Sequence, residues 1–237
     1  MNFKTLLIIA TLLAASGLPL ALYLSPDKTV NQPLFAQQID KVRNSLLSLK
    51  AKKASVEEIL KTKRCPGCNL REINLSGADL SGVDFRNTDL SRANLANTKL
   101  KDAKMSGVRL SEANLKNADL DGADLHDGQL QGADLSDANL FNIRLDKANL
   151  THAILHRVEL RDADLIGATL KNADLSQASL YGTRLTEADL TGANLSNTNM
   201  RYANLLKAVM GGANLKGADL RLAVMPDGTT AYGTTQY

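Results

Sequence analysis

The sequence predicts an all-β solenoid, and two observations carry this prediction. First, a large apolar residue recurs at every fifth position from Leu70 to Met225, with no insertion or deletion. Second, the residue two positions before it is small or β-branched, most often Ala, as in Ala78-Asp79-Leu80. Each five-residue unit therefore offers one large and one small side chain to a core.

A period of five fits neither the helical period nor the alternation of a strand. On a helix, each repeat would rotate the Leu stripe by roughly 140° and spread it around the whole cylinder. Short extended segments that alternate with tight turns keep the stripe inside, because each coil stacks on the one before. A core of Leu and Ala ladders also needs no aromatic residues, which suits a chain without Trp.

The corners of such a coil are predicted two positions after each large residue. Gly and Asn are frequent there, and both tolerate the positive φ of the third residue of a type II turn. The Gly corners are Gly77, Gly82, Gly107, Gly122, Gly132, Gly167, Gly182, Gly192, Gly212 and Gly217, and the Asn corners are Asn87, Asn97, Asn117, Asn142, Asn172 and Asn197. Turns therefore recur every five residues.

Units such as Ala123-Asp124-Leu125-His126-Asp127 and Ala193-Asn194-Leu195-Ser196-Asn197 resemble the pentapeptide-repeat family, whose motif is A(D/N)LXX. The resemblance implies a right-handed quadrilateral β-helix, with four pentapeptides in each twenty-residue coil. Residues 65–225 would then form about eight coils, spaced about 4.8 Å apart. The motif is specific for this fold and says little about function.

A twenty-residue coil predicts that side chains twenty positions apart are neighbours. On one face, the residues before the central Leu alternate in charge at every step: Arg64, Asp84, Lys104, Asp124, Arg144, Asp164 and Arg184. A shorter ladder comprises Glu72, Arg92 and Glu112. Because opposite charges on adjacent strands contribute only roughly 0.2–1 kcal/mol per pair, we interpret both ladders as structural.

Residues 1–25 are predicted to be a signal peptide or a membrane anchor. No charged residue occurs in segment 5–24, and Lys4 supplies a positive charge before it. Ala14-Ala15-Ser16 offers small residues, but a clean A-x-A cleavage site is missing, so cleavage and retention both stay open. Lys4 favours a cytoplasmic N-terminus. We therefore expect export to a periplasm or a thylakoid-type lumen, with membrane association through residues 5–24 as an alternative to release.

Residues 26–64 are predicted to form a linker and a helical cap. Pro26 and Pro33 break regular structure, and apolar residues then recur at helical spacing over residues 34–52. This helix either packs as a spacer or mediates homodimerisation.

The cap itself is predicted from a capping box, with Ser55 as N-cap and Glu58 at the third helical position. A short helix should follow to about residue 61. Its Val56, Ile59 and Leu60 would cover the first coil, because the open end of a solenoid exposes core and strand edges.

Cys65-Pro66-Gly67-Cys68 contains the only two cysteines of the chain. Pro and Gly suit a type II turn, which brings the first and fourth Cα atoms within about 7 Å. That distance allows a disulfide between Cys65 and Cys68, and export would favour oxidation. Both residues also fall on inward positions of the repeat, so a buried thiol pair fits equally. A thioredoxin-like redox site is the alternative, but it lacks a βαβ context.

No catalytic, cofactor-binding or metal-binding residues are predicted. His126, His152 and His156 lie on outward or corner positions, and we expect no second ligand or base to partner them. Asp residues repeat along the whole solenoid instead of converging as an acid/base pair. The sequence has no P-loop, dinucleotide fingerprint or nucleophile elbow. The chain is therefore predicted not to be an enzyme.

One predicted surface column is rich in aromatic and Arg residues. Each member follows a central Leu by one position and the previous member by twenty, and Tyr202 lies beside the column. These candidates for a protein-binding face are Phe141, Arg161, Tyr181, Arg201, Tyr202 and Arg221. They favour either cation–π stacking within the solenoid or contact with a partner, since Tyr and Arg are frequent at interfaces.

Residues 226–237 are predicted to be a C-terminal tail that begins with the turn signal Pro226-Asp227-Gly228. Apolar residues occupy outward positions near this end: Leu206, Val209, Leu222 and Val224. We expect the tail to fold back over some of them. The alternative is a homodimer contact through the C-terminal end.

Three functional classes remain open. The first is a non-catalytic scaffold that binds an unidentified protein partner, and the second is a thiol redox module. The third is a nucleic-acid mimic, because some pentapeptide-repeat proteins act on DNA gyrase through an acidic rod. Residues 69–225 carry eighteen Lys and Arg against twenty Asp and Glu, so the charge balance disfavours a mimic. Without a basic groove, no nucleic-acid partner is expected.

Overall fold

The structure, a computed structural model, describes residues 56–231. Every described residue belongs to one compact unit, Lys53–Tyr237. The predicted signal or anchor segment, the predicted helix over 34–52, Ser55 and residues 232–237 lie outside the described residues. Across the part that is described, no helix combines the length and apolar character required to cross a membrane.

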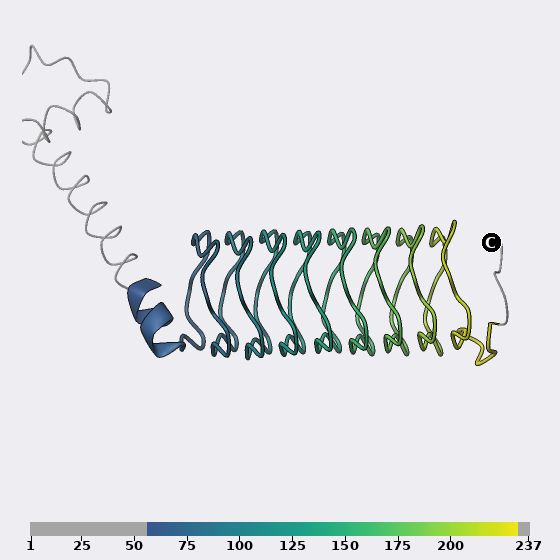
Figure 1. Cartoon of the computed structure of the whole chain (residues 1–237), viewed down its shortest axis with the longest axis horizontal. Helices are drawn as coiled ribbons and strands as arrows, with labels where there is room; N and C mark the ends of the chain where they lie inside the picture. Colours follow the sequence, from purple (N-terminus) through teal and green to yellow (C-terminus); the bar gives the residue numbers. More distant parts are fainter. Residues whose placement is uncertain (1–55, 232–237) are drawn as a thin grey trace, which may run out of the picture. The chain divides into compact units, whose positions relative to one another are not determined.

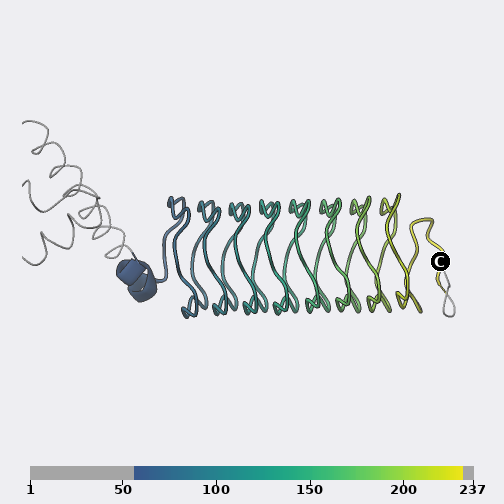
Figure 2. The same cartoon turned by 90° about the horizontal axis from the view of Figure 1, so that it is seen from above.

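From Arg64 to Val224, the chain forms a β-helix with twenty residues in each coil. Parallel bridges join residues twenty positions apart, from the pair Arg64 and Asp84 at one end to the pair Asn204 and Val224 at the other. Four bridge positions in each coil give it four sides, and the span of 160 residues makes eight coils. Figures 1 and 2 show these coils stacked side by side along one axis. The predicted twenty-residue period is confirmed.

Each corner of a coil is a tight turn closed by a backbone hydrogen bond. The amide of Ala78 donates to the carbonyl of Leu75 (3.0 Å), and Gly77 between them has a φ of 69°. The predicted Gly and Asn corners adopt positive φ, but so do ordinary residues at the same position, including Tyr202 with a φ of 59°. Hydrogen bonds between coils hold such residues in this otherwise unfavourable region.

The Asp or Asn before each central Leu supports the corner that follows it. Oδ1 of Asp79 accepts a hydrogen bond from the amide of Ser81 (3.1 Å), and Asn74 and Asp134 accept equivalent bonds. This arrangement is an Asx turn. Because the charged form accepts these bonds from Ser81, the pKa of Asp79 lies below its usual range. The repeated carboxylates therefore have a structural role.

The core consists of Leu and Ala ladders, and Phe85 is the one aromatic residue buried in its described part. Leu80, Leu115 and Leu150 have no exposed surface. Burying one such side chain completely contributes about 1.5–3 kcal/mol. Thr98 occupies a small inward position, and its hydroxyl donates to the carbonyl of Leu95 (2.6 Å), which satisfies its buried polar group.

A helix over residues 56–62 precedes the first coil. Ile59 is only 2% exposed and belongs to the same core cluster as the Leu ladders, and Val56 packs against that cluster. The expectation that Leu60 also covers the coil is wrong, since Leu60 is 37% exposed. Adjacent residues on a helix point about 100° apart, so Ile59 and Leu60 cannot both face the core.

The last coil is followed by a turn that runs back against it. Val224 forms an antiparallel bridge with Thr230, and the amide of Ala231 donates to the carbonyl of Ala223 (2.9 Å). Ala231 is buried in the core cluster. Outward apolar residues near this end differ in exposure: Leu206 and Val224 are half-buried, whereas Val209 and Leu222 are exposed.

Candidate functional site

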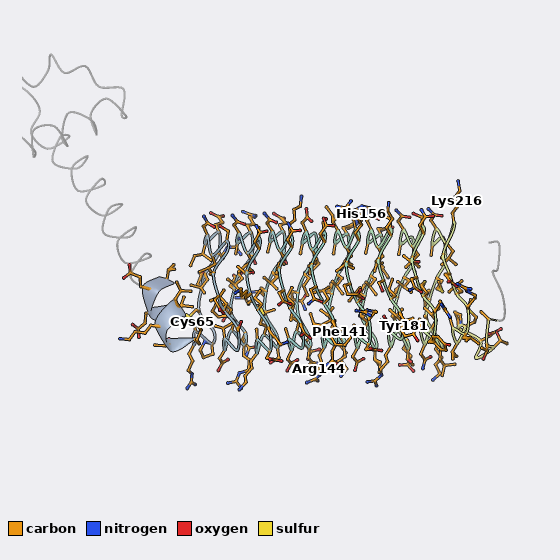
Figure 3. All side chains as sticks on the ribbon, in the orientation of Figure 1. Cys65, Phe141, Arg144, His156, Tyr181 and Lys216 are labelled. Atoms are coloured by element: carbon orange, nitrogen blue, oxygen red, sulfur yellow. A yellow bond between two sulfur atoms is a disulfide. The ribbon has the colours of Figure 1, made fainter. Side chains whose placement is uncertain are left out.

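The predicted aromatic and Arg column lies on one side of the solenoid, because its members occupy the same corner of successive coils. Figure 3 shows Phe141 and Tyr181 on one side of the stack and His156 at another edge. The preceding side chains hold this corner: Oδ1 of Asn139 accepts from the amide of Phe141 (3.2 Å), and Oε1 of Glu159 accepts from the amide of Arg161 (3.1 Å). The backbone thus presents these side chains outward.

Side chains of neighbouring coils stack on this corner, and we call the six residues predicted above the aromatic–arginine face. The guanidinium carbon of Arg161 lies 5.7 Å from the ring centroid of Phe141. The Arg201 guanidinium carbon lies 5.8 Å from the ring centroid of Tyr202. The rings of Tyr181 and Tyr202 meet edge to face, with centroids 5.1 Å apart. The predicted cation–π contacts are therefore present.

Stacking leaves much of the aromatic surface accessible. Phe141 and Tyr181 are each exposed, and Tyr202 is 46% exposed. Leu222, twenty residues after Tyr202 and also exposed, extends this apolar surface by one coil. Leu222 was predicted only as part of the C-terminal end, although the twenty-residue spacing places it in the column of Tyr202.

The three arginines of the face differ in their ionic contacts. Nε of Arg161 lies 3.0 Å from Oε1 of Glu159, and a terminal nitrogen of Arg221 lies 2.5 Å from Oδ2 of Asp219. The side-chain hydrogen bond from Arg221 also holds the pKa of Asp219 below its usual range. Arg201 has no carboxylate within ion-pair distance among the described residues, and its buried Nε has no hydrogen-bond partner there.

The sequence itself distinguishes Arg201 from the other two arginines of the face, although the prediction of the face did not use this difference. Each arginine contacts the residue two positions before it, which is Glu159 or Asp219 for the two paired arginines. For Arg201 that residue is the neutral Asn199, whose Oδ1 accepts from the Arg201 backbone amide (3.3 Å).

The predicted charge ladders are present in part. Arg144 contacts Asp124 (3.4 Å) and Arg184 contacts Asp164 (3.1 Å) across adjacent coils. The prediction was wrong for Asp84, which pairs with Arg86 two residues along the chain through two hydrogen bonds of 2.9 and 2.8 Å. Because Arg86 forms both bonds from the following corner, it reaches the nearly buried carboxylate more favourably than a side chain on a neighbouring coil. These bonds lower the pKa of Asp84 to about 2.

Two of the three histidines, His126 and His156, are more engaged than expected. Nδ1 of His126 lies 2.5 Å from Oδ2 of Asp146 on the next coil, and Nε2 lies 2.9 Å from Oδ2 of Asp127. The expectation that no partner is placed beside the histidines was therefore wrong for His126, and the twenty-residue spacing to Asp146 was the available signal. Carboxylates lie against both ring nitrogens, so His126 is engaged within the solenoid. Nδ1 of His156 bonds the Ser176 hydroxyl at 2.8 Å.

No cluster of three or more His, Cys, Asp or Glu residues within 56–231 is placed to hold a metal ion. Cys65 and Cys68 are joined by a disulfide, with Cα atoms 5.5 Å apart. Both are half-buried and pack against the core cluster. Their turn, close to helix 56–62 in Figure 3, is also held by backbone bonds, such as the one from the Cys65 amide to the carbonyl of Asp84 (2.9 Å).

A family model described as pentapeptide repeats matches the chain in eight copies, over residues 68–107, 103–142, 138–182, 178–217 and 188–225. No curated protein sequence matches the chain. The matched residues are those that form the coils, and they exclude helix 56–62.

Several solved structures are similar. HetL, a pentapeptide repeat protein involved in heterocyst differentiation regulation in the cyanobacterium Nostoc sp. strain PCC 7120, is 31% identical; the match covers 74% of this chain and 97% of HetL, with a TM-score of 0.47. A trypsin-treated form of QnrB1, a plasmid-mediated fluoroquinolone resistance protein, is 25% identical over 66% of this chain and 81% of that one, with a TM-score of 0.36. Rfr23 from the cyanobacterium Cyanothece 51142 is 26% identical over 70% and 94%, with a TM-score of 0.19.

Proposed function

This chain belongs to the pentapeptide-repeat family, and from that premise we propose that it is a non-catalytic scaffold that binds a protein partner through the aromatic–arginine face. The observation that carries the proposal is the exposed stack of Phe141, Tyr181 and Tyr202 interleaved with arginines. Tyr and Arg dominate the binding energy of many protein interfaces, because they offer apolar contact area together with hydrogen-bond donors.

Many polar side chains already make hydrogen bonds or ion pairs within the solenoid, which supports the proposal that the scaffold is not catalytic. Asp residues in the repeated slot hold corner amides, as Asp79 does for Ser81. His126 is bound by two carboxylates. A general base needs a free acceptor within reach of a substrate proton, and these groups are already used within the solenoid.

We further propose that the scaffold acts after export, in a periplasm or a thylakoid-type lumen, released or anchored by residues 5–24. The uncharged segment after Lys4 supports this. The Cys65–Cys68 disulfide is compatible with it, since disulfides persist mainly in oxidising compartments. Fractionation of the native host tests this part: we expect the chain with the membrane or the exported fraction, and full-length chain soluble in the cytoplasm would contradict it.

The binding proposal is tested by affinity purification of the tagged full chain from its native host. We expect specific proteins to be recovered with the wild type and lost when Arg161→Ala and Tyr181→Ala are combined. Ile154→Ala is the matched control, because Ile154 is an exposed apolar residue on another side of the coil, in the bridge column of Asp134 and Asp174. Identical recovery from the wild type and the double variant would exclude this face as the binding site.

A thiol redox module remains the second candidate, favoured by the half-buried Cys65–Cys68 disulfide. The amide of Gly67 between the cysteines donates to the carbonyl of Arg86 (2.8 Å), so the turn has support besides the disulfide. A redox role requires reversible reduction under conditions that leave the coils folded. Alkylation of the full chain after incubation with a protein dithiol tests this role. Cysteines that stay protected would exclude it.

A further inference from the structure

Arg201 differs from the other arginines of the aromatic–arginine face in its ion pairing and in the burial of its Nε atom. Glu159 neutralises Arg161 and Asp219 neutralises Arg221, at 3.0 and 2.5 Å respectively. Among residues 56–231, no carboxylate is within ion-pair distance of Arg201, and its Nε is buried without a hydrogen-bond acceptor. A guanidinium that has lost water from one nitrogen and gained no acceptor is left with unsatisfied hydrogen-bonding capacity.

The surroundings of this cation are apolar and exposed. Arg201 lies over the ring of Tyr202, at 5.8 Å from the centroid, and Tyr202 contacts Tyr181 at 5.1 Å. Leu222 follows Tyr202 on the next coil and is 39% exposed. A partner that covers these side chains would exclude water around Arg201, and a charge-assisted bond to its guanidinium strengthens as the local dielectric constant falls.

We propose that the aromatic–arginine face binds a protein segment in which a carboxylate side chain, flanked by apolar residues, pairs with Arg201. The inference rests on the proposed scaffold function and names the chemistry of its partner. The carboxylate pairs with the terminal nitrogens of the guanidinium, since the buried Nε is out of reach of a partner, while the flanking apolar residues cover Tyr181, Tyr202 and Leu222. Such an anchor at the centre of a dry patch is where interfaces gain most of their affinity.

The distribution of charge favours a protein segment over a nucleic acid. Glu159, Asp162 and Asp219 lie on the same side of the coils as the arginines, and two of them already pair with Arg161 and Arg221. A polyanion that followed the column would meet these carboxylates at successive coils. One carboxylate placed on Arg201 meets a guanidinium that makes no ion pair among residues 56–231.

The experiment selects peptides from a displayed random twelve-residue library against the full chain, with counter-selection against the variant that combines Tyr181→Ala and Tyr202→Ala. We expect the selected peptides to contain Asp or Glu beside Leu, Ile or Phe. In fluorescence polarisation, Arg201→Ala should weaken binding at least tenfold, and replacement of the peptide Glu by Gln should weaken it equally. Arg221→Ala is the matched control, which removes an arginine already paired with Asp219, and should weaken binding less than threefold.

The outcomes separate this inference from the function on which it rests. Peptides that depend on Tyr181 and Tyr202 but bind Arg201→Ala unchanged would overturn the inference and leave the scaffold function intact. A selection that yields no face-dependent binder would overturn both. Competition of a single-stranded oligonucleotide with the peptide would overturn the inference in favour of a nucleic acid as the occupant of this face. Self-association of the chain that Arg201→Ala abolishes would overturn it in favour of a second copy of this chain. Arg201→Gln serves if Arg201→Ala fails to fold, as judged by circular dichroism.

Discussion

The side-chain oxygen of Asn87 lies against the backbone of Gly107 on the next coil, so closely that a Cβ atom added to Gly107 would be 2.4 Å from it. Asn172 and Asn197 stand in the same relation to the Gly residues twenty positions later, also at 2.4 Å. At these three positions the Asn side chain lies close to a Gly of the following coil, whereas Asn97 is followed by Asn117, so a Cβ atom beside a corner Asn is also accommodated.

We expect Gly107→Ala to destabilise the solenoid by no more than about 1 kcal/mol beyond Gly132→Ala, because the Oδ1 atom that a new Cβ would meet is the end of a side chain that can rotate. Both residues have a φ of 65°, so the backbone strain of Ala is equal, but the nearest atom to a Cβ at Gly132 is 3.8 Å away. Urea unfolding of the two variants measures the difference. Adding Asn87→Gly should remove the part of the loss that exceeds that of Gly132→Ala, and strictly additive effects of the two changes would refute the steric explanation.

Reversing the charge of Arg92 should destabilise the coils in a salt-dependent way. Arg92 lies between Glu72 (3.5 Å) and Glu112 (3.0 Å), so Arg92→Glu places three carboxylates in one column. All three positions have positive φ, and Glu already occupies two of them, so the backbone accepts the change. We expect a loss of about 1 kcal/mol in low salt that shrinks in 1 M NaCl. Arg92→Gln, which only removes the ion pairs, should lose less than about 0.5 kcal/mol.

The stability of the solenoid should fall as pH drops from about 4 towards 2. Hydrogen bonds from Arg86 lower the pKa of Asp84 to about 2. Burial has the largest effect at Asp89 and opposes the shift, but bonds from Ser91 and Arg71 together with the charge of Arg109 outweigh it, and the pKa of Asp89 is also about 2. The unfolded chain, with Asp pKa values near 3.9, binds more protons in this window, so protonation favours unfolding.

Asp84→Asn isolates one contribution to this acid sensitivity. Arg86 is half exposed and solvent screens the pair, so we expect a loss of only about 1 kcal/mol at pH 7. At pH 2, close to the pKa of Asp84, most of the stability that its ionisation contributes is lost, so the urea midpoints of the variant and the wild type should lie much closer together than at pH 7. A difference that persists unchanged at pH 2 would assign the effect to packing instead of charge.

Helix 56–62 should stabilise the first coil through Ile59. Removing this buried side chain with Ile59→Ala should cost about 2–4 kcal/mol locally, whereas Leu60→Ala, at an exposed position, should change stability by less than about 0.5 kcal/mol. Because coils contact only their neighbours, hydrogen exchange should accelerate at the amides of Cys65 and Leu70 and stay unchanged near Leu150. Equal acceleration along the whole stack would contradict this local role.

The sequence predicts the contact partner of a surface side chain only where the twenty-residue spacing alone determines which side chains are neighbours. Arg144 with Asp124 follows directly from the spacing. Asp84 does not, because its low exposure and the rotamer of Arg86 favour a bond within the same coil. The stacking of Tyr181 on Tyr202 also depends on side-chain direction, since these residues are twenty-one positions apart and occupy different corner positions.

The sequence by itself determined the coils, their inward ladders and their corners, because a five-residue period without insertions admits only one way to bury Leu70 to Met225. It also placed the aromatic and Arg residues in one column. Only the tertiary structure decided which charges are neutralised. Whether a guanidinium reaches a carboxylate on its own coil or on the next one depends on side-chain direction and local burial, as the pairing of Asp84 with Arg86 within one coil shows.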